Sequence, residues 1–135
     1  MLKVTCALII RDNKLLITQN NFKSDHPFQW EFPGGKIKTG ETLENCIKRE
    51  IMEELEIEIE ILSTMKAVIY DYGFKKIKLY PFLCSIKNGK IKLNEHDDCM
   101  WIELNDLKNI DFSGADKKLI QQEQNMEILK KYLRE

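Results

Sequence analysis

Carboxylates crowd one short stretch of this 135-residue chain. Residues 41–60 contain eight acidic side chains against only Lys48 and Arg49, so this segment carries a charge of −6; because the whole chain is −1, the remainder is +5. Carboxylates held this close repel one another unless positive charge compensates them. The stretch therefore predicts either a solvated acidic helix face or a site where cations meet a small anionic ligand.

Helical geometry separates these two interpretations. Thr42 is expected to cap a helix over about residues 43–55, because its hydroxyl can accept a backbone N–H of the first turn. With an advance of about 100° per residue, Glu50 and Glu54 fall inside the apolar stripe of that helix and Glu53 falls at its border. We expect all three carboxylates to point toward protein. All-oxygen ligands favour a hard ion, Mg²⁺ or Mn²⁺, and such an ion implies phosphate chemistry.

Upstream of the helix, the segment PGGKIKTGE supplies two glycines and a lysine. Gly34 and Gly35 are expected to form a tight turn that lets backbone approach a ligand closely, and Lys36 offers a point charge for phosphate. A Gly-Gly turn alone is weak evidence of a site. Its spacing from the acidic helix makes the combination specific.

Together these residues resemble the signature of the Nudix hydrolases. Eight of nine defining positions match within 23 residues: Gly35, Glu41, Arg49, Glu50, Ile51, Glu53, Glu54 and Ile57. The exception is Glu56, where the family usually has a glycine that ends the helix in a left-handed conformation; that conformation costs another residue roughly 1 kcal/mol. The segment WEFPGGKIKTGETLE is most similar to the MutT-like branch, which contains small pyrophosphohydrolases of nucleoside triphosphates.

The resemblance implies a fold and a reaction. The fold is of the α+β class: a Nudix α/β/α sandwich with a mixed β-sheet between helices, formed by a single domain over residues 1–135. The reaction is Mg²⁺-dependent hydrolysis of (deoxy)nucleoside triphosphates to a nucleoside monophosphate and pyrophosphate, with Mn²⁺ as the alternative ion. Oxidised guanine nucleotides and cytidine nucleotides are the candidate substrates.

Residue by residue, the resemblance also implies roles. The implied metal ligands are the carbonyl oxygen of Gly34 and the carboxylates of Glu50, Glu53 and Glu54. Arg49 would hold a catalytic glutamate in position by an ion pair, and Glu41 would support the loop. Glu95 matches an acidic loop position that in relatives contributes to metal binding or proton abstraction; a solvated loop acid is the alternative. The general base stays open among Glu50, Glu53 and Glu95.

Four residues are the candidates for substrate binding: Lys36, Phe32, Asp116 and Tyr80. Asn20 stands where the branch often places an arginine, so Lys36, or else Lys23, is expected to contact phosphate. Tyr80 lies in an alternating run, so one face of its strand is expected to line the base pocket. Asp116 resembles a base-contacting position. Because an ionised carboxylate only accepts hydrogen bonds, it suits the amine edge of cytosine or of guanine, the alternative being an acid that complements a helix dipole.

The remaining pattern predicts the elements around these residues. Strands are expected at 3–10 and 14–18 as a hairpin, at 30–32, within 57–72 and 75–86 as two long strands, at 90–93 after an Asn88-Gly89 hairpin turn, and at 99–104. Ser113 is expected to cap one last helix in which apolar residues recur at helical spacing up to Leu133.

The composition argues against two classes of binding partner. A nearly neutral chain argues against a nucleic acid polymer, and the absence of a run of about 18 apolar residues or a leader cleavage site argues against a membrane partner. Four cysteines without a CxxC pair are expected to be reduced, which favours a cytoplasmic location. We expect a nucleotide substrate and a monomer or homodimer.

Two other functions stay open from sequence. The nine-position signature, or Nudix box, recognises a diphosphate and not the groups attached to it, so another nucleoside diphosphate derivative could be the substrate, although the short chain favours small nucleotides. A noncatalytic module that senses a nucleotide is the rival from another class. Such a module would be expected to lack acids of the box, and here Glu50, Glu53 and Glu54 are all present.

Overall fold

An Asp-Asn turn folds the first two strands against each other in the computed structural model, which describes residues 1–134. Asp12 and Asn13 have φ angles of 52° and 63°, the consecutive left-handed pair that a two-residue hairpin turn requires. The turn joins β1 (Leu2–Arg11) to β2 (Lys14–Gln19). The predicted hairpin is confirmed.

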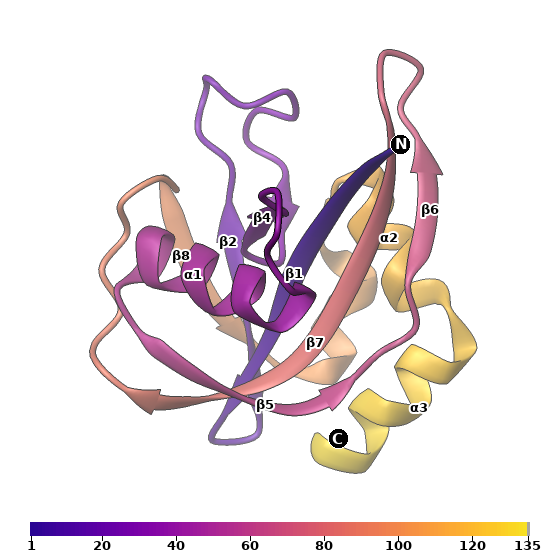
Figure 1. The fold of residues 1–135 in the computed structure, drawn as a ribbon. Helices are drawn as coiled ribbons and strands as arrows, with labels where there is room; N and C mark the ends of the chain where they lie inside the picture. The colour runs from indigo at the N-terminus through magenta and orange to yellow at the C-terminus, as the bar shows by residue number, and fades with distance from the viewer. Residues whose placement is uncertain (135) are drawn as a thin grey trace.

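β1 lies inside a mixed eight-stranded sheet (Figure 1). It pairs in parallel with β7 (Lys76–Asn88), from Leu2 opposite Ile77 to Ile9 opposite Cys84, and antiparallel with β2 and with β4 (Gly34–Lys36). The outer strands are β3 (Trp30–Glu31) and β8 (Asp98–Ile102) beside β2, and β5 (Glu58–Thr64) and β6 (Val68–Asp71) beside β7.

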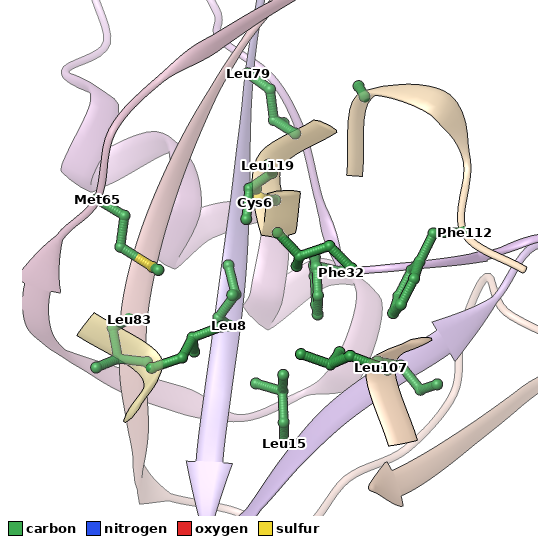
Figure 2. Close-up of a cluster of buried hydrophobic side chains, with 14 of the residues drawn as sticks. Cys6, Leu8, Leu15, Phe32, Met65, Leu79, Leu83, Leu107, Phe112 and Leu119 are labelled. Atoms are coloured by element: carbon green, nitrogen blue, oxygen red, sulfur yellow. The ribbon is translucent and has the colours of Figure 1, made fainter. Parts of the chain in front are cut away.

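Alternate side chains of β1 enter two separate cores, as the period of two in a strand dictates. Cys6 and Leu8 enter the core that also contains side chains of the 3₁₀ helix η1 (Leu104–Asn109), α2 (Gly114–Gln121) and α3 (Glu123–Tyr132). Figure 2 shows this core. Ala7 and Ile9 enter the other, which α1 (Leu43–Leu55) covers. Helices therefore lie on both faces of the sheet, and the predicted sandwich is confirmed.

Two expected strands differ from the structure. The run 57–72 is broken into β5 and β6 because the backbone of Lys66 bonds to the side chain of Asn125 instead of to β7. Residues 90–93 form no strand, so the predicted hairpin after Asn88 is wrong. Lys92 there donates its backbone N–H to the carbonyl of Leu55, at the end of α1.

The predicted last helix is two helices. α2 ends at Gln121 and α3 begins at Glu123, because Gln122 takes an extended conformation with φ −72° and ψ 124°. Ser113 precedes α2 as expected, but its hydroxyl donates to Asp116 and does not accept a backbone N–H. Within the described residues, none of the helices combines the length and apolar character needed to cross a bilayer.

Candidate active site

α1 begins and ends where the sequence predicts. The Thr42 hydroxyl accepts the N–H of Asn45 at 3.1 Å. Glu56 ends the helix in the left-handed region, with φ 56° and ψ 36°, and donates its N–H to the carbonyl of Met52. A glutamate thus takes the conformation expected of the family glycine.

The three glutamates of α1 have different surroundings. Glu54 is 2% exposed, and the side chain of Glu50 is 15% exposed. The side chain of Glu53 is 47% exposed. The expectation that all three point toward protein is therefore confirmed for Glu50 and Glu54 and wrong for Glu53, which lies at the border of the apolar stripe and turns outward.

Arg49 joins the helix acids to the loop before the helix. Its Nε and Nη2 donate to Glu41 at 2.6 and 2.9 Å, and its Nη1 donates to Glu50 at 2.8 Å and to Glu53 at 3.2 Å. The hydrogen bond from Arg49 lowers the pKa of Glu41 to about 2. One guanidinium therefore contacts three carboxylates, although its single positive charge offsets only one of them. The ion pair with Glu50 is present, and the role of Arg49 in positioning a catalytic glutamate stays a prediction.

Glu54 has no such partner: no lysine or arginine of residues 1–134 forms an ion pair with it. Its Oε1 accepts the backbone N–H of Gly34 at 3.3 Å. Burial, followed by the negative charges of Glu31 and Glu50, raises the pKa of Glu54 well above its ordinary value. A positive charge beside Glu54 would stabilise its ionised form and so oppose both the burial and the repulsion that raise its pKa.

Gly34 and Gly35 lie in strand β4 and not in the predicted tight turn. Gly34 is opposite Cys6 of β1 and Gly35 is opposite Thr5. A β-carbon on Gly34 would collide with the carbonyl oxygen of Thr5, and one on Gly35 would collide with the carboxylate of Glu50. The two glycines therefore let β4 pack closely against β1 and Glu50, whereas a close approach of this backbone to a ligand stays a prediction.

A cavity of about 180 Å³ opens beside β4. Phe32, Lys36 and Asp116 line it, which brings three of the four predicted substrate residues together. Tyr80 does not line it, because this residue packs against the core under α1 on the opposite face of β7. The prediction that Tyr80 faces the base pocket is therefore wrong. Successive side chains of a strand point to opposite faces, and it is the neighbouring Leu79 that faces the cavity.

Asp116 is held at the wall of this cavity. Its Oδ2 accepts the backbone N–H of Phe32 at 2.7 Å, and its Oδ1 accepts the hydroxyl of Ser113 at 3.0 Å. Burial, followed by the charge of Glu31, raises the pKa of Asp116 to about 7. The residue is also in the first turn of α2, but its bond to Phe32 ties it to the cavity and not only to the helix dipole.

A second, polar cavity of about 380 Å³ shares Glu31 with the first. Lys23, Glu95 and His96 line it. Asn20 is 5% exposed and donates to the carbonyl of His26, so it shapes the loop. Sequence reasoning missed Glu31 and His96, whose side chains meet here; their positions directly before Phe32 and after Glu95 were the only available signals.

Comparison with known proteins assigns this arrangement to a family. A family model, the NUDIX domain, matches residues 1–122. The chain belongs to the Nudix family. This Nudix chain is 37% identical over 127 residues to an 8-oxo-dGTP diphosphatase of Buchnera aphidicola subsp. Schizaphis graminum (strain Sg), covering 94% of this chain and 96% of that one.

Two further known proteins are similar to this Nudix chain over most of its length. A CTP pyrophosphohydrolase of Escherichia coli (strain K12) is 28% identical, covering 90% of each chain. The solution structure of the E. coli ORF135 protein matches with a TM-score of 0.79 at 28% identity, covering 95% of this chain and 90% of that one. The chain is therefore a Nudix hydrolase.

Nudix hydrolases generally need a divalent metal ion, and the donor chemistry here fits one. Carboxylate and carbonyl oxygens suit a hard ion, and a bound cation would stabilise the ionised form of Glu54 that burial and the neighbouring acids disfavour. Among residues 1–134, however, no three acidic, histidine or cysteine side chains are gathered so that they hold an ion as they stand. Arg49 instead engages Glu50 and Glu53, so the predicted ligand set stays a prediction.

Proposed function

We propose that this Nudix hydrolase cleaves (deoxy)nucleoside triphosphates to a nucleoside monophosphate and pyrophosphate. One observation carries the proposal: Gly35 lines the Asp116 cavity and lies so close to Glu50 that a β-carbon on it would collide with the Glu50 carboxylate. A base bound beside Asp116 would therefore place its phosphates along β4, next to the acids of α1.

The chemistry of Asp116 supports oxidised guanine or cytidine nucleotides as the preferred substrates. Each oxygen of its carboxylate already accepts one bond, from Phe32 or Ser113, and keeps capacity to accept another. The amine edges of guanine and of cytosine supply such donors. The names of the two relatives, an 8-oxo-dGTP diphosphatase and a CTP pyrophosphohydrolase, agree with these two bases.

The proposed roles follow the positions of the residues. The carbonyl of Gly34 and the carboxylates of Glu50, Glu53 and Glu54 would hold Mg²⁺, which when bound polarises phosphate oxygens and activates water. Lys36 lies exposed at the cavity and neutralises phosphate charge, while Arg49 orients Glu50 through the 2.8 Å ion pair. The carboxylate that takes the proton of the attacking water is Glu50, Glu53 or Glu95.

The proposal extends to the domain, the resident ion, the compartment and the oligomeric state. Residues 1–135 form one Nudix domain, with Mg²⁺ as the resident ion and Mn²⁺ as its substitute. Cys6, Cys46, Cys84 and Cys99 are all unpaired, which supports a reducing compartment such as the cytoplasm. The active species is a monomer or a homodimer.

The test is a ranking of kcat/KM over 8-oxo-dGTP, dGTP, CTP, dCTP, ATP and a nucleotide sugar, with Mg²⁺ or Mn²⁺. We expect pyrophosphate release to be fastest from an oxidised guanine or a cytidine triphosphate. Preference for the nucleotide sugar would move the enzyme to another substrate class. Nucleotide binding without hydrolysis of any member, with either ion, would support the noncatalytic module and overturn the proposal.

A further inference from the structure

His96 is enclosed between two acids to which the fold brings it from a distant part of the chain. Its side chain is 5% exposed, and its Nε2 lies 3.0 Å from Oε2 of Glu31 and 3.8 Å from Oε1 of Glu54. Its Nδ1 is buried and has no hydrogen-bond partner among the described residues. All the polar contacts that the structure gives this ring are therefore on the Nε2 side.

The chain on both sides of His96 is anchored. Before it, Asn94 donates its backbone N–H to the carbonyl of Glu54 at 3.0 Å and its side-chain amide to the carbonyl of Glu53 at 2.9 Å. After it, Asp97 donates its N–H to the carbonyl of Gln19 at 3.1 Å. These bonds attach the loop to the end of α1 and to β2, so the position of the ring is set by backbone contacts.

The chemistry of the two neighbours decides which ring nitrogen carries a proton. An ionised carboxylate only accepts hydrogen bonds, so the nitrogen that faces Glu31 must donate. Nδ1 has no acceptor, so the single proton of a neutral ring is placed on Nε2. That one N–H points at Glu31, and Oε1 of Glu54, at 3.8 Å, lies within electrostatic reach but beyond hydrogen-bond distance.

We propose that His96 is a positioning residue that uses its Nε2–H to hold Glu31 and to orient the carboxylate of Glu54. The inference rests on the proposed function, in which Glu54 is a metal ligand. Without this donor, the buried acid Glu54 and the partly exposed acid Glu31 would face each other unshielded, and Glu54 would keep only the 3.3 Å contact from Gly34. Glu31 also lines the Asp116 cavity, so the bridge links the base-binding and metal-binding sides of the site.

Two substitutions separate positioning from packing. In His96→Gln the side-chain amide reaches the place of Nε2, whereas in His96→Asn it reaches only the place of Nδ1. We expect His96→Asn to weaken Mn²⁺ binding in the absence of nucleotide, followed by the electron paramagnetic resonance signal of free Mn²⁺, by about 10- to 100-fold. We expect kcat for the best triphosphate to fall by a similar factor with KM nearly unchanged.

His96→Gln should stay within about threefold of the wild type in both measurements, since it restores the donor. Asp97→Asn, an exposed change in the same loop, is the matched control and should alter neither. Normal Mn²⁺ binding and turnover in His96→Asn would overturn the proposal. Equal losses in His96→Gln and His96→Asn would also overturn it, because they would show that the donor at the Nε2 position is not what matters.

A measurement on the wild type decides the point if a variant fails to fold. The ¹⁵N chemical shifts of the His96 ring report which nitrogen is protonated. We expect a protonated Nε2, and a neutral ring with its proton on Nδ1 would overturn the bridge. If the wild type binds Mn²⁺ but hydrolyses no nucleotide, the proposed function fails while Mn²⁺ binding and the ring shifts still test the role of His96.

Discussion

The acids of one helix differ residue by residue because each meets a different neighbour. Glu53 reaches solvent and Arg49, Glu50 is enclosed between Arg49 and Gly35, and Glu54 is buried against other acids. Identical side chains thus have three environments within five positions. A carboxylate that is buried without a cationic side chain is the one that most needs an external cation.

Glu54→Gln should reduce turnover by about a thousandfold, equivalent to roughly 4 kcal/mol of transition-state stabilisation. The amide keeps the shape, can still accept the N–H of Gly34 and removes a carboxylate that is buried among other acids, so we expect the melting temperature not to fall. Steady-state kinetics with Mg²⁺ and a thermal melt measure the two effects. Glu60→Gln, at an exposed position of β5, is the control. Full turnover in both Glu54→Gln and Glu53→Gln would remove the metal-site assignment.

Asp116 should make stability depend on pH. Its pKa rises from 3.8 to about 7 on folding. The stability that this group contributes is therefore fully present below about pH 4 and is lost as pH rises toward 7. Asp116→Asn does not ionise. We expect its free energy of unfolding, relative to the wild type, to increase with pH by on the order of 1 kcal/mol per unit in this window. Urea unfolding in EDTA between pH 4 and 8 tests this, and a constant difference would contradict it.

At the scale of elements, the end of α1 determines where the following loops lie. Glu56 turns the chain in a left-handed conformation, and residues 92–94 then bond to the carbonyls of Leu55 and Glu54. Gly89, with φ 101°, packs directly on the backbone of Glu56. The segment 90–93, which the sequence predicts to be a strand, therefore covers the end of α1 instead. This position brings Glu95 and His96 to the site.

Glu56→Gly should raise the free energy of unfolding by up to about 1 kcal/mol, because glycine adopts φ 56° without the steric strain of a β-carbon. Turnover should not change. The opposite substitution in the same contact, Gly89→Ala, should destabilise, since its β-carbon would lie 2.9 Å from the carbonyl oxygen of Glu56. Denaturant unfolding compares the two variants. A less stable Glu56→Gly protein would show that the helix end is not strained.

At the scale of the whole molecule, one buried amide joins the helical layer to the sheet. Asn125 of α3 is fully buried; its Oδ1 accepts the N–H of Lys66 at 2.6 Å and its Nδ2 donates to the carbonyl of the same residue at 2.9 Å. A further bond from Nδ2 reaches Leu119 at 3.2 Å. The connection between β5 and β6 is thus held by a residue about 60 positions away.

Asn125→Ala should lower the free energy of unfolding by about 2–4 kcal/mol, because it leaves the part-buried backbone groups of Lys66 and the buried carbonyl of Leu119 without this partner. Gln124→Ala, on the exposed side of the same helix, should change it by less than about 0.5 kcal/mol. Urea unfolding measures both, and equal values would contradict the role of Asn125. Activity of the folded Asn125→Ala protein should persist, since the residue is remote from the cavity linings.

The sequence by itself determined what depends on neighbouring residues: the hairpin at Asp12-Asn13, the bounds of α1, the spacing of its acids and the family. The tertiary structure decided what depends on distant ones. Glu31 and His96 meet across 65 positions, strand pairing puts Gly34 beside β1, and the register of β7 turns Leu79 and not Tyr80 to the cavity. Periodicity and capping report local conformation, whereas pairing register and burial arise only when separate segments pack.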